Sequence, residues 1–335
     1  MINKLLITMG VLALTGITVY QLHSASQENE LRSRFMQFKE DFSKSYGSPS
    51  ELEFRFGVFK TTVARVNKNN SDKTKTHTAG INKFSDLTFA EFKTMYLTDF
   101  NQSADLTSTE EVTFNGKASV DWRTTDGVGP VKNQGQCGSC WAFSTTASLE
   151  FATFVEDKRV VSLSEQELVD CSTTYGNNGC NGGLMAYAYD YIRGYKLALE
   201  SNYPYRAVDG TCSSTNRAKP NREGSPPYST ISPANVNGLL AAAENQVVSV
   251  AIEVQNDFMD YSGGVYTSDP YCGYQLNHGV AVVGYNNSAS VPYFIVRNSW
   301  GGSWGLEGYV NMAVSTGSGT CGICLLYTSP SPRDS

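Results

Sequence analysis

Residues 30–116 begin with a regular helical spacing of apolar side chains and end without one. Over residues 30–70, apolar and aromatic side chains recur at helical spacing, so we expect two helices there. Over residues 97–116 the periodicity is lost, and Asp, Ser, Thr and Asn become frequent. That composition is typical of an exposed, cleavable linker. The pattern therefore predicts a helical leader that a linker separates from the rest of the chain.

Beyond the linker, the sequence predicts helices first and strands afterwards. Helical patterns lie at about residues 139–156 and 183–193, and Ser164 to Glu167 has the spacing of a capping box. The later runs are short, β-branched or aromatic, and separated by Gly, Asn and Pro; they are 247–252, 279–284 and 293–298. We expect an α+β protein of two lobes, with a cleft between them that could hold a site.

The N-terminus has the pattern of a targeting segment. Lys4 precedes an apolar run from Leu5 to Val19, and small residues follow at 24–26. This predicts a signal peptide over residues 1–24. A signal anchor is the alternative, but the run is short for a bilayer span and no basic residue follows it closely. We expect the protein in the secretory pathway, bound for a lysosome or digestive vacuole or for the exterior.

Composition narrows the classes of protein. The chain is 40% hydrophobic and 17% charged, so it can bury a sizeable core. Its net charge of -6 gives no long-range attraction to phosphates or anionic lipid, and we expect neither nucleic acid nor, once mature, membrane as a partner. All eight cysteines lie between Cys137 and Cys324. In an oxidising compartment, this predicts a disulfide-stapled domain behind a thiol-free leader.

The last twelve residues, CLLYTSPSPRDS, match the translation of a sequencing adapter. We interpret segment 324–335 as not native and draw no function from it. The expected division is a signal peptide at 1–24, a leader at 25–115, a mature domain at 116–323 and this tail.

The strongest local signal is QGQCGSCW, which begins at Gln134. In it, a glycine-rich turn delivers Cys140 into the first turn of a predicted helix. A helix N-terminus and a nearby cationic imidazole lower the pKa of a thiol, so the thiolate becomes available as a nucleophile. We interpret Cys137, which is nearer to the turn, as half of a disulfide.

Only one histidine follows the linker. If the mature part uses an imidazole base, that base must be His278. Asn298 lies twenty residues further on, before Ser-Trp-Gly, and its side-chain oxygen could accept the other N–H of the imidazole. A nucleophile, a base and a group that orients the base follow the logic of a catalytic triad.

These motifs resemble the papain family, in its cathepsin L-like subgroup, over residues 30–323. The CGSCW signature precedes His278 by 138 residues and Asn298 by 158, counted from Cys140, a spacing typical of that family. The leader resembles the family's ERFNIN helix and, after it, the GxNxFxD motif. The ERFNIN positions are Glu51, Arg55, Phe59, Val66 and Asn70, with Thr62 where asparagine is usual, and the second motif is Gly80, Asn82, Phe84 and Asp86.

The resemblance implies a papain-like fold with a helical lobe and a β-barrel-like lobe. The leader would be an I29-like helical propeptide that lies along the cleft and inhibits until it is removed. Cys140 would attack the peptide carbonyl, His278 would deliver a proton to the leaving amine, and Asn298 would orient His278. Gln134 and the Cys140 N–H would hold the oxyanion. No metal or other cofactor is implied, and the activity expected is that of a cysteine endopeptidase.

The resemblance also implies disulfides, a substrate cleft and partners. The expected disulfides are Cys137–Cys180, Cys171–Cys212 and Cys272–Cys321. The expected substrate-binding residues are Gly182 and Gly183, as the backbone edge that hydrogen-bonds the substrate, and the residues of the main side-chain pocket, Leu184, Met185, Ala251, Leu276 and Gly279. This apolar, open pocket predicts a preference for a hydrophobic residue one position before the scissile residue. Polypeptide substrates, the chain's own propeptide and cystatin-type inhibitors are the expected partners, and we expect a monomer.

Two other classes of protein fit parts of the sequence. Cys137 with Cys140, and Cys321 with Cys324, form two C-x-x-C pairs that could build a zinc or redox site. A catalytically inactive binding protein could also keep a papain-like scaffold, since fold does not determine function.

Overall fold

The computed structural model describes residues 25–100, 113–195, 197–213, 228–230, 232–267 and 272–330. The predicted signal peptide at 1–24 and most of the predicted linker lie outside these residues. The chain divides into two compact units, one of residues up to 65 with 85–87, the other of residues 66–84 with those from 88 onward. In the described part of the chain, no helix is both long and apolar enough to cross a membrane.

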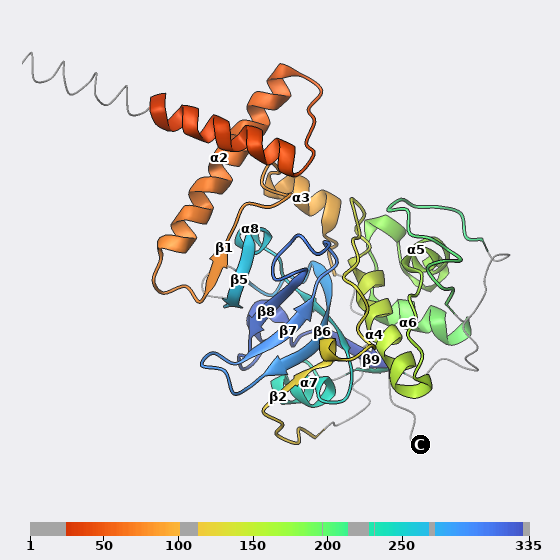
Figure 1. Ribbon diagram of the computed structural model, residues 1–335. Coiled ribbons are helices and arrows are strands. Elements are labelled where there is room, and N and C mark those ends of the chain that lie inside the picture. The colour runs from red at the N-terminus through yellow and green to blue at the C-terminus, as the bar shows by residue number, and fades with distance from the viewer. Residues whose placement is uncertain are drawn as a thin grey trace, which may run out of the picture. The chain divides into compact units, whose positions relative to one another are not determined.

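The first unit is built from the two helices that the leader sequence predicts. One spans residues 25–41, and the other is α2 (Pro49–Ser71), which continues into the second unit (Figure 1). Their apolar faces meet in an aromatic cluster, in which the ring of Phe35 lies 5.4 Å from that of Phe56 and 5.3 Å from that of Phe59. Burial of these large rings stabilises the helix pair.

Asp86 makes its side-chain contacts within this same unit. It is 3% exposed, and its carboxylate accepts from Lys44 Nζ at 2.7 Å and from the Tyr46 hydroxyl at 2.9 Å. Arg55 donates to the Asp86 main-chain oxygen at 3.1 Å. The last residue of the GxNxFxD motif therefore joins segments of the leader to one another.

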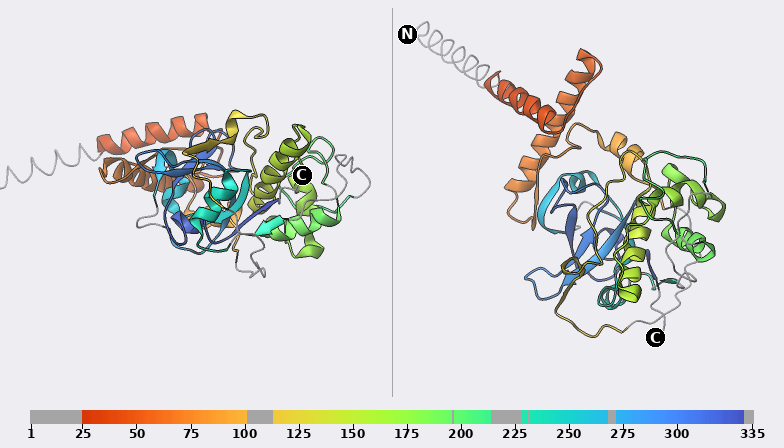
Figure 2. Two further views of the ribbon diagram at one scale, coloured as in Figure 1. Left: turned by 90° about the horizontal axis from the view of Figure 1, so that it is seen from below. Right: turned by 45° about the vertical axis from the view of Figure 1, so that its right-hand side comes forward.

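The second unit contains the helical lobe that the sequence predicts, and Figure 2 shows the yellow-green and green helices between residues 140 and 194 to one side of the sheet. The helices of this unit are α3 (Phe89–Tyr96), α4 (Cys140–Asp157), α5 (Glu165–Cys171), α6 (Met185–Gly194), α7 (Val236–Ala243) and α8 (Asn256–Met259). Short 3₁₀ turns lie at Trp122–Thr124, Thr173–Tyr175, Gly179–Asn181 and Thr320–Gly322. The core of the lobe buries Trp141 of α4 with Leu168 of α5 and Tyr189 of α6.

Half of the predicted capping box forms at α5. The Ser164 side chain accepts from the Glu167 N–H at 3.0 Å. The carboxylate of Glu167 is fully buried and accepts instead from the Tyr191 hydroxyl at 2.7 Å and the Ala198 N–H at 2.6 Å. Tertiary partners therefore take the side chain that a local cap would have used.

The other lobe is a sheet of nine described strands in the order β1-β5-β8-β7-β6-β4-β9-β3, with β2 paired to β6. The strands are β1 (His77–Ala79), β2 (Ser119–Asp121), β3 (Tyr228–Thr230), β4 (Val248–Ile252), β5 (Tyr261–Tyr266), β6 (His278–Asn286), β7 (Tyr293–Arg297), β8 (Tyr309–Ala313) and β9 (Tyr327–Pro330). Only β5 and β8 pair in parallel among them. The predicted strands at 247–252, 279–284 and 293–298 are β4, β6 and β7, and the predicted α+β fold is confirmed.

Two segments from outside the predicted mature domain join the sheet. Strand β1 of the leader pairs antiparallel with β5, and Asn70 holds it by accepting from and donating to the main chain of Ala79 at 2.9 Å. Strand β9 pairs with β4 and β3. The interpretation of residues 324–335 as an adapter translation stays a prediction.

Candidate active site

Cys140 is the first residue of α4 and follows a tight turn. Gly135 adopts a φ of +59° in that turn, a conformation that favours glycine. Cys140 is 0% exposed, and burial raises the pKa of its thiol to about 12, although N–H groups including that of Gly279 partly offset the rise. The thiol therefore keeps its proton as long as it is buried.

His278 begins β6 and is oriented by Asn298. The Nε2 atom of His278 lies 2.8 Å from Asn298 Oδ1, and the imidazole stacks on Trp300 with ring centroids 4.7 Å apart. Burial lowers the pKa of His278 to about 4, and the hydrogen bond to Asn298 partly offsets this. The Nδ1 atom of His278 has no hydrogen-bond partner in the described part of the chain.

Sheet pairing brings these residues together. Strands β6 and β7 are antiparallel neighbours, with Ala281 opposite Arg297. The start of β6 and the end of β7 therefore lie at the same edge of the sheet, which places His278 beside Asn298. Gly279 brings β6 onto α4, because a Cβ on it would lie 3.1 Å from main-chain atoms of Cys140.

Gln134 is fully buried, with both ends of its amide engaged. Its Oε1 accepts from the Ser299 hydroxyl at 2.6 Å. Its Nε2 donates to the carbonyl oxygens of Tyr96 and Cys137, each at 2.9 Å. Tyr96 lies in the predicted leader, so a carbonyl of that segment occupies the amide that Gln134 was expected to offer to an oxyanion.

The leader continues from Tyr96 along the predicted substrate-binding residues. The Thr98 N–H donates to the Asn277 carbonyl at 2.8 Å, and the Phe100 N–H to the Leu276 carbonyl at 3.1 Å. A Cβ on Gly182 would lie 1.8 Å from Thr98 Oγ1, so only glycine allows this approach. The start of the predicted linker is therefore extended and hydrogen-bonded to the region of the site.

The structure brings most of the predicted pocket residues together. Phe100 and Leu276 pack against the apolar cluster that contains Met185 and Ala251, both at most 1% exposed. Leu184 is buried, and its N–H donates to Asn177 Oδ1 at 2.8 Å. A Cβ on Gly183 would lie 2.4 Å from that same oxygen. Gly279, by contrast, lies directly against Cys140.

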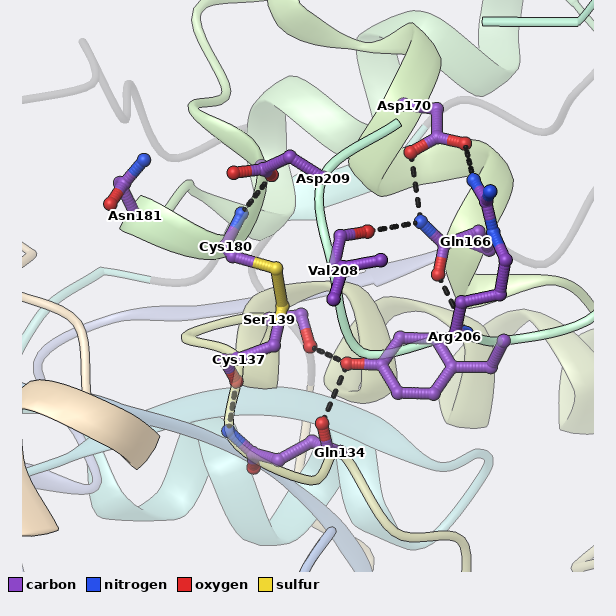
Figure 3. Close-up of a disulfide and its surroundings, with 12 residues drawn as sticks. Gln134, Cys137, Ser139, Gln166, Asp170, Cys180, Asn181, Arg206, Val208 and Asp209 are labelled. Carbon is purple, nitrogen blue, oxygen red and sulfur yellow. Dashed lines mark hydrogen bonds and ion pairs between the residues drawn. A yellow bond between two sulfur atoms is a disulfide. The ribbon is translucent and has the colours of Figure 1, made fainter. Parts of the chain in front are cut away.

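The described cysteines form the three disulfides that the family resemblance implied, Cys137–Cys180, Cys171–Cys212 and Cys272–Cys321. Figure 3 shows Cys137 joined to Cys180, whose N–H donates to Asp209 Oδ1 at 2.7 Å. Cys140 and Cys324 stay free. Because Cys137 and Cys321 are each in a disulfide, the two C-x-x-C pairs do not supply four thiolates for zinc.

The sequence did not predict a buried charge cluster, of which Lys132 and Glu150 line the same pocket as Asn298. Lys132 donates to Glu150 at 2.8 Å and to Glu165 at 2.7 Å, and both carboxylates are at most 4% exposed. Its Nζ also donates to the Leu163 carbonyl at 3.0 Å. Lys132 stands two residues before Gln134, yet lysine there reads as an ordinary surface residue, and nothing local signals its partners.

Two family descriptions match the chain. "Papain family cysteine protease" matches residues 117–330, and "Cathepsin propeptide inhibitor domain (I29)" matches residues 35–92. The second match lies within the predicted leader.

Relatives that match along nearly the whole chain are also cysteine proteases. Cysteine protease XCP2 of Arabidopsis thaliana is 40% identical over 326 residues, covering 94% of this chain and 90% of the relative. A cathepsin L-like proteinase of Fasciola hepatica is 38% identical over 302 residues, covering 88% and 91%. Digestive procathepsin L 3 of Tenebrio molitor has a solved structure with a TM-score of 0.79 and 36% identity, covering 90% of this chain and 99% of that one. The chain therefore belongs to the papain family of cysteine proteases and is a cysteine-type endopeptidase that carries a cathepsin propeptide inhibitor domain.

Proposed function

We propose that Cys140, His278 and Asn298 are the catalytic triad of this endopeptidase, with Gln134 and the Cys140 N–H as oxyanion donors. The observation that carries the proposal is the orientation of His278. Its Nε2 faces Asn298 Oδ1 at 2.8 Å, so that nitrogen carries the proton, and Nδ1 is left as the base. The residue after it, Gly279, lies against Cys140.

Each group then has one task in peptide hydrolysis. Cys140 Sγ, after giving its proton to His278 Nδ1, attacks the carbonyl carbon to form a tetrahedral intermediate. His278 returns that proton to the leaving amine as the C–N bond breaks, which leaves a thioester. Water, deprotonated by His278, then attacks the thioester, and the carboxylic acid is released as Cys140 regains a proton.

The leader keeps these groups in a state unsuited to catalysis. Under its cover, burial raises the pKa of Cys140 to about 12 and lowers that of His278 to about 4, so both are neutral near pH 7. The Tyr96 carbonyl also occupies Gln134 Nε2. We expect removal of the leader to admit water, which stabilises the thiolate and imidazolium, and to free the oxyanion donor.

The leader's own contacts support a hydrophobic substrate preference. Phe100 packs on the cluster of Met185 and Ala251, next to Leu276, whose carbonyl accepts its N–H. We infer that this apolar surface receives the side chain one position before the scissile residue. The side chains of Met185, Ala251 and Leu276 are all apolar, so a cation beside them would lose hydration.

A substrate panel tests this preference. Peptides with Leu or Phe at that position should have a kcat/KM at least about 10-fold above the peptide with Arg there. All peptides carry the same scissile residue, and a parallel set varies only that residue as the control. A higher kcat/KM for the Arg peptide would contradict the inferred pocket.

The cellular context follows from the same features. Disulfides and the inhibitor domain support passage through the secretory pathway. We propose action in a lysosome, in a digestive vacuole or outside the cell, as a monomer with polypeptide substrates, and with cystatin-type inhibitors as partners. The proposed mature domain starts near residue 116.

Covalent labelling tests the proposed nucleophile. A peptide epoxide probe should label the acid-matured enzyme at Cys140, as located by peptide mass mapping, because only an accessible, activated thiol reacts. The precursor at about pH 7 should stay unlabelled, because Cys140 is 0% exposed there. Mature enzyme with His278→Ala is the control and should react slowly. Folded, leader-free wild-type protein that resists the probe would instead support an inactive binding scaffold.

A further inference from the structure

The turn between Gln134 and Ser139 determines where both proposed oxyanion donors point. Gln134 carries one donor on its side chain, and the other is the N–H of Cys140, which follows Ser139. The Gln134 side chain is held by Ser299, and the Cys137–Cys180 disulfide holds the middle of the turn. Main-chain hydrogen bonds also hold the turn, from the Gln134 N–H to the Ser299 carbonyl at 2.8 Å and from the Gly138 N–H to the Cys180 carbonyl at 2.9 Å. None of these contacts joins Gln134 to Ser139, the two ends of the turn.

Tyr205 joins those two ends. Its hydroxyl donates to the Gln134 carbonyl at 2.7 Å and lies 2.6 Å from Ser139 Oγ. Figure 3 shows Gln134 and Ser139 facing the same hydroxyl from two sides. A phenol has a single proton, which Tyr205 gives to Gln134, so the Ser139 hydroxyl must donate to Tyr205.

Tyr205 is itself fixed in place. Its N–H donates to Glu200 Oε1 at 2.8 Å. Its ring packs edge-on against Phe143 of α4, with centroids 4.8 Å apart and an interplanar angle of 84°. Burial raises the pKa of its phenol, so the proton that it donates to Gln134 is retained at every working pH. The tyrosine therefore links the oxyanion turn to the helix that carries Cys140.

We propose that Tyr205 is a positioning residue for the oxyanion site. Its hydroxyl holds the two ends of the turn at a set separation, so that Gln134 Nε2 and the Cys140 N–H converge on one oxygen. Preorganised donors stabilise a transition state because they need no reorganisation during the reaction. This inference rests on the proposed roles of Gln134 and Cys140.

The substitution Tyr205→Phe removes the hydroxyl and keeps the ring on Phe143. In the mature enzyme we expect kcat to fall about 10-fold with KM within about 2-fold, because misaligned donors weaken only transition-state binding. A peptide aldehyde, whose hemithioacetal oxygen uses the same donors, should bind about 10-fold more weakly. Alkylation of Cys140 by iodoacetamide creates no oxyanion and should keep its rate within about 2-fold.

Tyr203→Phe is the matched control from the same segment. The Tyr203 hydroxyl donates to Asp170 at 2.8 Å, a residue that also binds Arg206, outside the oxyanion turn. Tyr203→Phe should leave the ratio of aldehyde affinity to alkylation rate unchanged. If Tyr205→Phe and Tyr203→Phe behave alike, or if Tyr205→Phe slows alkylation as much as turnover, the positioning role is overturned.

A double-mutant cycle separates this inference from the proposed function. If Tyr205 acts through Gln134, the effect of Tyr205→Phe on kcat should largely vanish in a Gln134→Ala background. If Gln134→Ala alone leaves kcat and aldehyde affinity unchanged, the oxyanion assignment fails, whatever Tyr205 does. Should Tyr205→Phe fail to fold, Ser139→Ala removes the hydrogen bond from its other end. An unchanged kcat in that variant would then overturn the proposal.

Discussion

Replacement of Cys140 by alanine is expected to lower the rate of peptide hydrolysis by on the order of 10⁶-fold, as loss of a catalytic nucleophile does in other proteases. The mutant keeps His278, Asn298 and the oxyanion donors, but no atom remains that can form the thioester. Alanine fits this buried site because it is smaller than cysteine by one sulfur atom. Folding should therefore persist while chemistry is lost.

The measurement is hydrolysis of a fluorogenic dipeptide with Phe and then Arg, at about pH 5.5 with a thiol reductant, a condition suited to an acidic compartment. Because the mutant cannot mature itself, a separate active protease removes its leader and is then inhibited. Cys324→Ala is the matched control, since Cys324 is the other free cysteine of the chain. Comparable activity in Cys140→Ala and wild type would disprove the proposed nucleophile.

Replacement of Lys132 by methionine is expected to destabilise the fold by about 3–5 kcal/mol, because it removes the cation paired with buried Glu165 and leaves Glu150 with Arg297, 4.0 Å away. Glu150 and Glu165 are 4% and 0% exposed, and both bind Lys132 within 2.8 Å. The loss of stability should be measured as a lower denaturation midpoint. The measurement uses the precursor with Cys140→Ala, which cannot digest itself.

The loss should also depend on pH. Burial raises the pKa of Glu165 to about 7, and Lys132 opposes that rise, so the pKa climbs further in the mutant. In the mutant, folded Glu165 binds its proton at a pH above 7, where the wild-type carboxyl is still ionised, so the deficit shrinks as pH falls to about 7. Below that pH the carboxyl is protonated in both proteins, and this group changes the deficit no further. The deficit should therefore be smaller near pH 5 than near pH 8.

Two variants make this prediction specific. Lys93→Met removes an exposed ion pair with Asp99 at 3.2 Å, and should change stability by less than about 1 kcal/mol. Adding Glu165→Gln to Lys132→Met should recover part of the loss, because one buried charge is removed. Equal effects of Lys132→Met and Lys93→Met would show that the cluster contributes no more than a surface pair.

The sequence alone determined what depends on local pattern. Helical periodicity located the leader helices and α4, alternation and β-branching located β4, β6 and β7, and the turn before Cys140 marked the nucleophile candidate. With one histidine after the linker, the sequence also left a single candidate base, His278. The helices and strands are where the sequence predicts them because spacing along the chain decides which residues share a face or begin a helix. The roles of Cys140 and His278 stay proposals.

Tertiary structure decided what depends on residues distant in sequence. Lys132 binds Glu165, Tyr205 donates a hydrogen bond to the Gln134 carbonyl, and the Tyr96 carbonyl accepts one from the Gln134 amide. These pairs form only because the folded chain brings them together. For the same reason the Glu167 carboxylate accepts from the Tyr191 hydroxyl and does not complete the local capping box. A buried polar group binds whichever partner the packing supplies, since leaving it unpaired is costly, and packing follows the whole chain and not the local pattern.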